Sequence, residues 1–362
     1  MQGNLKHVSL ALGATLLITA LGALQYLSVR GAFAKIQPRA IAGCAAQPLP
    51  GSAEDFAIDR ATGLAYLSVL DRRAARDEPL RTGTILKLNL KQQGAQPLPA
   101  TVGDPPGFRP QGLSLWSHAP DPLRLFVVNR PLDAEGREEQ TIEVFEEQPD
   151  GLLHYQKTLR DALFVHPIDL AAVGPDQFYL SNDSGAHNAL SRAVEALFQL
   201  GWSDVIYYDG AHASVAVSER KFGAGVTVST DGLRLYLAEA GARQVLIFDR
   251  DTETGSLYWS GLIELAGAPD KLDIGADGSL WAAVQPNSWA AVRNLSSARP
   301  APTMILRMPA PVNGFVKPQP VYVNGGGEFS AGSIGMVYAE RLYVGSATEK
   351  KLLICPLPAE KT

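Results

Sequence analysis

One short hydrophobic pattern recurs six times along the chain. Each copy follows a turn and sets an aromatic residue among small and β-branched residues, as in Gly-Leu-Ala-Tyr-Leu-Ser around Tyr66. Consecutive copies lie 45–62 residues apart, and the remaining five centre on Phe126, Tyr179, Tyr236, Trp281 and Tyr343. Short runs of this composition are typical of buried β-strands. The pattern therefore predicts six similar β-sheets.

Six such sheets also predict how the chain is assembled. A sheet with two apolar faces cannot bury both alone, so the sheets must pack against one another. Radial packing of four-stranded sheets gives an all-β, six-bladed β-propeller, which we expect over residues 44–358. Turn signals at 61–63, 230–232 and 276–278 separate the expected strands. A propeller gathers loops from every blade at one end of its channel, where a functional site is expected.

The N-terminal region has a different pattern. Residues 8–29 hold no charged side chain, and Lys6 and Arg30 flank them. A helix of about 20 apolar residues spans a bilayer core of roughly 30 Å. We expect a membrane anchor over 1–30 and a linker over 31–43, with the propeller on the extracytoplasmic side. A cleaved signal peptide, which would leave a secreted protein, and a buried core helix remain as alternatives.

A second helix is expected inside the propeller region. Residues 188–202 carry apolar side chains at helical spacing directly after an expected strand, and Gly201 is a plausible stop. We expect a short helix over the channel face. It would serve as a lid or a second membrane contact, or it would be an ordinary packed surface helix.

Composition and motifs exclude several classes. Of the 362 residues, 46 % are hydrophobic and 19 % charged, and the net charge is −5, so a nucleic-acid partner is not expected. The sequence contains no Walker-type phosphate loop, no dinucleotide fingerprint, no Gly-x-Ser-x-Gly elbow and no His-Glu-x-x-His motif. The class of protein must therefore be inferred from other residues.

The chain has two cysteines, Cys44 and Cys355, near the two ends of the expected propeller. If the first and last segments share one blade, a disulfide between them would close the ring. An exported chain would permit that oxidation. The alternative is two unrelated free thiols.

Four carboxylates stand out from the hydrophobic background. Glu54 and Asp55 come early in the first blade, Asp169 lies inside an apolar run, and Asp270 precedes the Trp281 strand. A buried carboxylate is costly unless it is paired or binds a cation. Inner strands could bring these residues together, and oxygen ligands of this kind suit calcium. A turn cap or a hydrogen-bonded structural carboxylate is the ordinary alternative for each.

Residues 44–355 resemble the paraoxonase/arylesterase family of six-bladed propeller hydrolases. The similarity follows family order and is carried by residues 51–55, 126–131, 142–145, 168–183, 225–232, 285–287 and 345–355. The resemblance implies hydrolysis of small-molecule carboxylic esters or lactones. It also implies an uncleaved N-terminal hydrophobic segment, a disulfide between Cys44 and Cys355, and two calcium ions in the channel.

The resemblance implies different outcomes for the two ions. The structural ion is held by two aspartates that match Asp55 and Asp169 and by a carbonyl at Leu113, so one structural calcium is expected. For the catalytic ion, Glu54 and Asp270 match two ligands. The three asparagine ligands of the family are replaced here by Ile168, Ala224 and Lys271. The family's histidine pair, which is proposed to activate water, is replaced by Gln111 and Arg130.

This departure predicts a substitution. We expect the Lys271 ammonium to lie between Glu54 and Asp270, where it would replace the catalytic calcium. The predicted function is a membrane-tethered arylesterase- or lactonase-like hydrolase, with Lys271 or Arg130 as electrophile and a carboxylate as base. The alternative is a non-catalytic propeller that serves as an extracytoplasmic binding or scaffolding module.

Overall fold

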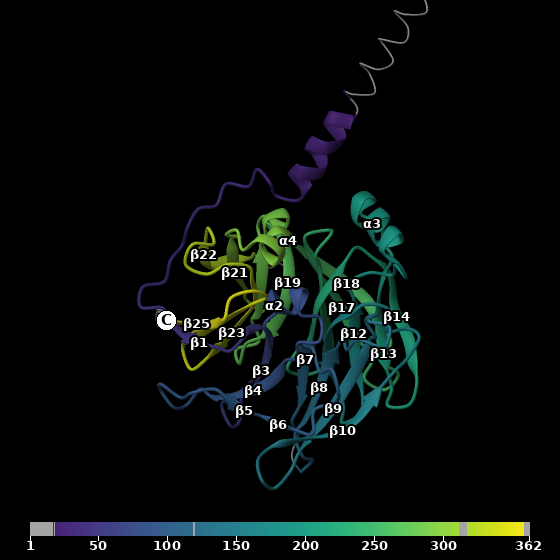
Figure 1. The fold of residues 1–362 in the computed structure, drawn as a ribbon, viewed down its shortest axis with the longest axis vertical. Helices are drawn as coiled ribbons and strands as arrows, with labels where there is room; N and C mark the ends of the chain where they lie inside the picture. The colour runs from purple at the N-terminus through teal and green to yellow at the C-terminus, as the bar shows by residue number, and fades with distance from the viewer. Residues whose placement is uncertain (1–16, 18, 119, 311–316, 358–362) are drawn as a thin grey trace, which may run out of the picture.

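Six sheets surround a central axis in the computed structural model, which describes residues 17, 19–118, 120–310 and 317–357 (Figure 1). Blade one contains β2 (Ser52–Asp59), β3 (Leu64–Leu70), β4 (Thr84–Asn89) and β5 (Leu98–Pro99); blade two contains β7 (Pro110–Trp116), β8 (Arg124–Asn129), β9 (Thr141–Glu147), β10 (Leu153–Leu159) and β6 (Thr101–Val102). Blade three contains β11 (Pro167–Ala172), β12 (Phe178–Asn182), β13 (Ser203–Tyr208) and β14 (Ala213–Arg220); blade four contains β15 (Gly223–Val228), β16 (Arg234–Glu239), β17 (Gln244–Arg250) and β18 (Leu257–Glu264). Blade five contains β19 (Ala268–Ile274), β20 (Leu280–Gln285), β21 (Thr303–Met308) and β22 (Gln319–Asn324); blade six contains β23 (Gly332–Tyr338), β24 (Arg341–Ser346), β25 (Lys351–Pro356) and β1 (Ala45–Pro48).

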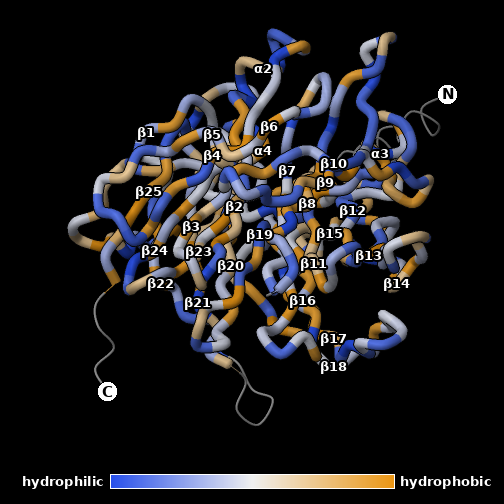
Figure 2. Tube along the Cα trace, turned by 90° about the horizontal axis from the view of Figure 1, so that it is seen from below, coloured by the Kyte–Doolittle hydropathy of each residue, from blue (hydrophilic) through white to orange (hydrophobic). Residues whose placement is uncertain are grey.

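The blades form a closed ring. The first strand of each blade, from β2 through β7, β11, β15 and β19 to β23, contacts the first strand of the next blade, and β23 returns to β2. The prediction of a six-bladed propeller is confirmed. The six aromatic residues of the repeat all lie on the second strand of their blades, and none is more than 5 % exposed. Figure 2 shows apolar stretches along the strands in the middle of the ring.

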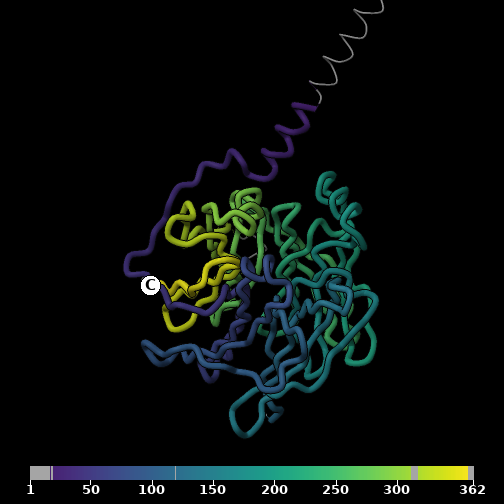
Figure 3. Tube along the Cα trace, in the orientation of Figure 1, coloured from purple at the N-terminus to yellow at the C-terminus, as the bar shows by residue number. Residues whose placement is uncertain are grey.

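The two ends of the chain meet in blade six. Strand β1 pairs with β25, so the blade combines the first strand of the chain with its last three. Cys44 and Cys355 form a disulfide beside this pairing. The linker before β1 passes blade five, where Arg39 pairs with Val323 of β22, before it reaches blade six (Figure 3). The disulfide expected from the sequence is therefore present, and it fixes the seam of the ring.

Helices cluster at one end of the propeller. Helix α3 (Ala189–Phe198) lies within the predicted 188–202 segment, and the Asn188 side chain caps it by accepting a hydrogen bond from the Ser191 amide. The sequence analysis did not predict α4 (Ser288–Ser297) or the single turn α2 (Ala74–Asp77).

The expected anchor lies partly outside the described residues, which exclude 1–16 and 18. Residues 17 and 19–29 are helical. Among the residues that the structure describes, no helix combines the length and the apolar character needed to cross a bilayer.

Candidate functional site

All six inner strands bend at the same level of the channel. The pairing register of each with its neighbour shifts near its first residues, between 53 and 55, 110 and 113, 167 and 169, 223 and 226, 269 and 272, and 332 and 334. Such a bulge breaks the alternation of side chains along a strand. Consecutive residues such as Glu54 and Asp55, or Asp270 and Lys271, can therefore both face the channel region.

A cavity of about 450 Å³ opens at this end of the channel. Four of the predicted catalytic residues line it, namely Glu54, Gln111, Arg130 and Asp270, together with Ile168 and Ala224 at two former ligand positions. Five of them lie on the first strands of blades one to five, and Arg130 follows β8, the second strand of blade two. The structure thus gathers these residues into one pocket, as the propeller geometry led us to expect.

The N-terminal segment covers one side of this cavity. The Arg30 carbonyl accepts hydrogen bonds from the Ser288 amide and hydroxyl of α4, at 3.0 and 3.2 Å. The Arg30 guanidinium donates to the Ala196 carbonyl of α3 at 3.1 Å. Val292 and Leu295 of α4 add apolar surface to the lining. Both helices and the end of the N-terminal segment therefore meet at the cavity mouth.

Lys271 lies elsewhere than predicted. Its side chain is only 1 % exposed and does not line the cavity. The ammonium donates to the Ile168 carbonyl and forms an ion pair with Asp169, with Nζ 3.3 Å from Oδ1. Within the described residues it makes no ion pair with Glu54 or Asp270 shorter than 4.0 Å. The predicted position between those two carboxylates is therefore corrected.

Glu54 is paired with Arg72 and not, as the sequence analysis predicted, with Lys271. Arg72 Nε lies 2.5 Å from Glu54 Oε2, and both side chains are about nine-tenths buried. Burial raises the pKa of Glu54, but the positive charges of Arg72, Lys271 and Arg130 outweigh it and hold the pKa below its ordinary value. Arg72 also donates to the Pro110 carbonyl at 2.9 Å. The sequence analysis missed Arg72 because no motif marks it.

Asp55 and Asp169 are held by backbone amides. Asp55 accepts from the amides of Phe56 at 2.9 Å and Leu113 at 2.8 Å, and Asp169 Oδ2 accepts from Val226 at 3.0 Å. Burial raises the pKa of both carboxyls, and the charge of Asp169 adds to the effect on Asp55. These two acids therefore need a nearby cation to stay ionised together.

That cation is the Lys271 ammonium. Burial lowers the pKa of Lys271, but the charges of Asp169, Asp55, Glu54 and Asp270 outweigh it and raise the pKa above its ordinary value. The lysine therefore keeps its proton. Its single positive charge interacts with four carboxylates.

The predicted calcium site consists of Asp55, Asp169 and the Leu113 carbonyl. Calcium takes 6–8 oxygen ligands, yet one Asp169 oxygen faces an ammonium and the other a backbone amide. A divalent cation beside the Lys271 ammonium would be strongly repelled at this depth. Among the described residues, no three His, Cys, Asp or Glu side chains are grouped to hold a metal. As arranged, these residues do not fit a calcium ion.

Asp270 is the carboxylate best placed for proton transfer. It lines the cavity. Its pKa is raised to about 7, chiefly by burial. The negative charges of Glu54 and Asp169 raise the pKa further, whereas the positive charges of Lys271 and Arg72 lower it. A group that titrates near neutral pH can both accept and return a proton.

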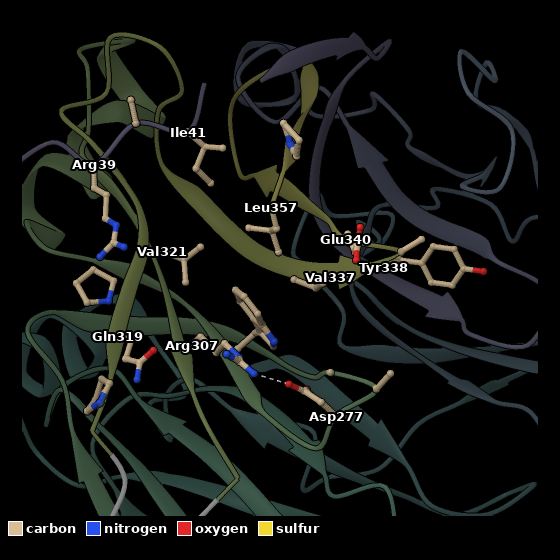
Figure 4. Close-up of a pocket in the computed structure, with 18 of the residues that line it drawn as sticks. Arg39, Ile41, Asp277, Arg307, Gln319, Val321, Val337, Tyr338, Glu340 and Leu357 are labelled. Atoms are coloured by element: carbon tan, nitrogen blue, oxygen red, sulfur yellow. Dashed lines mark hydrogen bonds and ion pairs between the residues drawn. The ribbon is translucent and has the colours of Figure 1, made fainter. Parts of the chain in front are cut away.

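A larger cavity of about 1350 Å³ lies between blades five and six (Figure 4). It is at the opposite end of the propeller, since β19 begins at the channel cavity and the turn that follows it lines this one. Arg307 pairs with Asp277 at 2.6 Å, as the figure shows, and Arg60 pairs with Asp273 at 2.8 Å. No predicted site residue lines this cavity.

The fold and cavity define a class: a six-bladed propeller with a charged pocket at one end of its channel. The family model described as Arylesterase matches residues 65–357, so the chain belongs to the Arylesterase family. It is 27 % identical over 280 residues to serum paraoxonase/arylesterase 2 of Rattus norvegicus, covering 76 % of this chain and 77 % of the relative. It is 28 % identical over 284 residues to serum paraoxonase/lactonase 3 of Homo sapiens, covering 77 % of each.

Among solved structures, a luciferin-regenerating enzyme is similar at a TM-score of 0.53. The identity is 14 %, and the match covers 87 % of this chain and 96 % of that one. At this identity the similarity shows the fold alone. The family resemblance read from the sequence is thus confirmed by the family model and the curated relatives.

Proposed function

We propose that the protein hydrolyses carboxylic esters or lactones and that Lys271, rather than calcium, is the cation inside its channel. Family membership supports hydrolysis, since relatives are named arylesterases and lactonases. The observation that carries the proposal is the channel cavity, which joins the near-neutral carboxyl of Asp270 to the guanidinium of Arg130.

The reaction follows from these two groups. Asp270 accepts a proton from a water molecule as the oxygen attacks the carbonyl carbon. Arg130, fixed by its hydrogen bond to the Pro167 carbonyl at 2.8 Å, stabilises the negative charge that develops on the carbonyl oxygen. When the carbon–oxygen bond to the leaving group breaks, the alkoxide takes the proton from Asp270. The products are a carboxylic acid and an alcohol, or a hydroxy acid from a lactone.

Lys271 acts through its neighbours because it does not line the cavity. Its charge lets Asp55, Asp169 and Glu54 remain together although all three are buried. We therefore assign it a positioning role and not that of the electrophile.

A direct assay tests the proposal. The purified full chain is incubated with phenyl acetate, a simple lactone and a wider ester panel, with and without EGTA. We expect turnover that EGTA does not change. Loss of turnover in EGTA would contradict the role of Lys271. No hydrolysis across the panel would favour the second candidate, a binding module, which the apolar Ile168 and Ala224 at former ligand positions also favour.

We further propose an extracytoplasmic, membrane-tethered protein. The disulfide between Cys44 and Cys355 supports an oxidising compartment. The uncharged stretch 8–29 supports a tether. Fractionation of cells that make the full chain is the test: we expect the protein to resist carbonate extraction, and a soluble pool shortened at its N-terminus would show cleavage instead.

A further inference from the structure

The channel cavity holds more positive charge than the proposed reaction uses. Its ionisable lining residues are Arg30, Arg72, Arg130 and Arg243 against Glu54, Asp183 and Asp270. This basic excess contrasts with the net charge of −5 carried by the whole chain.

Ion pairs within the protein neutralise two of the three lining carboxylates. Glu54 is paired with Arg72 at 2.5 Å, and Asp183 is paired with Arg192 at 2.8 Å. Asp270 is the one lining carboxylate without an ion pair shorter than 4.0 Å among the described residues. Three lining guanidiniums, those of Arg30, Arg130 and Arg243, form no ion pair with a carboxylate among the described residues.

These three guanidiniums are also incompletely hydrogen-bonded within the described part of the chain. The Nε atoms of Arg30 and Arg130 are buried without a hydrogen-bond partner. Their terminal nitrogens donate only to backbone carbonyls, those of Ala196 and Pro167. The pKa of Arg243 is lowered by burial, with no opposing charge that would raise it. All three side chains are partly buried, and desolvating a cation without a partner that pairs with it costs free energy.

Two of the three lie at the same rim of the cavity. Gly31 has a positive φ of +73°, and a Cβ built there would lie 2.9 Å from Arg243 Nη2. The Arg243 guanidinium therefore packs against the residue that follows Arg30. Arg130 belongs to blade two, whereas Arg243 follows β16 of blade four. Arg30 and Arg243 are thus separate from Arg130, to which we assign stabilisation of the negative charge on the carbonyl oxygen.

We propose that the substrate is an ester or lactone bearing a second, anionic group, which Arg30 and Arg243 bind at the cavity mouth. Guanidiniums bind carboxylates and phosphates through two parallel hydrogen bonds, which gives geometry as well as attraction. An anion at the rim pairs with these two partly buried guanidiniums and leaves the ester near Arg130 and Asp270. The inference rests on the proposed hydrolase for its kinetic assay, but anion binding can be measured without turnover.

The test uses a matched pair of esters, 4-acetoxybenzoate and its methyl ester, which differ in one negative charge. We expect kcat/KM to be about tenfold higher for the anion, corresponding to one charged hydrogen-bonded contact. In Arg243→Gln and in the Arg30→Gln/Arg243→Gln double variant this ratio should fall to about one. Arg243→Lys should retain part of it. The control is Arg137→Gln, since Arg137 is exposed, pairs with Asp133 and does not line the cavity.

A second measurement separates failure of this inference from failure of the hydrolase. Calorimetry follows binding of 4-acetamidobenzoate, an amide analogue, to the wild-type protein. Binding that Arg243→Gln abolishes, without hydrolysis of either ester, would support the anion site and refute the enzyme. Equal hydrolysis of both esters without analogue binding would overturn the anion site and leave the enzyme standing.

Discussion

Asp270 and Asp277 belong to one continuous segment, yet they lie at opposite ends of the propeller and titrate in opposite directions. Asp270, on β19, lines the channel cavity, and burial raises its pKa to about 7. Asp277, in the turn after β19, is half-exposed. Burial raises its pKa, but the hydrogen bonds from Ser279 and the hydrogen bond and charge of Arg307 together outweigh it and lower the pKa to about 2. The same residue type is therefore poised for proton transfer at one end and fully ionised at the other.

The comparison extends to the two cavities. The larger one, between blades five and six, contains arginines that pair with acids of the protein. The smaller one keeps three guanidiniums without a carboxylate partner and one buried carboxyl of near-neutral pKa. Volume alone would select the end whose arginines are paired. We select the other end, because perturbed charged groups cluster at functional sites.

The largest expected effect concerns activity. We expect Asp270→Asn to lower kcat by about 10²- to 10⁴-fold, as is typical when a general base is lost. The matched control is Asp277→Asn, which should keep wild-type kcat/KM, because Asp277 lies at the other end. Steady-state kinetics with the best ester or lactone gives the comparison. Similar losses in both variants would indicate a general effect on folding, and full activity of Asp270→Asn would remove it as the base.

The next effect concerns the cation. Lys271→Met removes the positive charge beside Asp169 and should lower the free energy of unfolding by about 3–5 kcal/mol, as for other broken buried pairs. Millimolar calcium should restore part of that loss, since the space beside Asp169 is then open. Urea denaturation in calcium and in EGTA measures the loss of stability and its recovery. The control is Lys157→Met, which breaks the exposed ion pair between Lys157 and Asp176.

The wild-type protein gives the independent check on the cation. Its Tm should be the same in EGTA and in calcium, and elemental analysis should find much less than one calcium per chain. A chelator-sensitive Tm would restore the calcium site that the family resemblance implied.

Several features of the molecule could be predicted from its sequence. The six aromatic residues defined the blades because each sits on a buried second strand, where local composition and burial agree. Glu54, Gln111, Arg130 and Asp270 could be expected at one channel end, because order along the chain fixes order around the ring.

Side-chain depth could not be predicted. Lys271 and Asp270 are adjacent beside the bulge in β19, yet Asp270 lines the cavity while the Lys271 ammonium is buried beside Asp169. Arg72 carries no motif, although it decides the state of Glu54. Helix α4 was missed because neither its weak apolar pattern nor its Asn287 cap distinguishes it from a loop.

The next prediction uses the raised pKa of Asp270. A carboxyl whose folded pKa lies above its unfolded value contributes stability that is complete below about pH 4 and is lost as the pH rises through about 7. Asp270→Asn cannot ionise, so it should be more stable than the wild-type protein at pH 8 and equal to it near pH 4. Urea denaturation across that range measures the difference. A variant that is inactive yet more stable would show that the cavity is strained for function.

The smallest effect lies at the other end and has the opposite sign. Asp277 has a folded pKa below its unfolded value, so its stabilisation is present above about pH 4 and is lost as the pH falls toward 2. Because the side chain is half-exposed, Asp277→Asn should cost less than about 1 kcal/mol at pH 7. The wild-type and variant curves converge with acid in both pairs, but at neutral pH Asp277→Asn should be less stable than the wild-type protein, whereas Asp270→Asn should be more stable. Curves that diverge in the same direction for both aspartates would remove the contrast between the two ends of the channel.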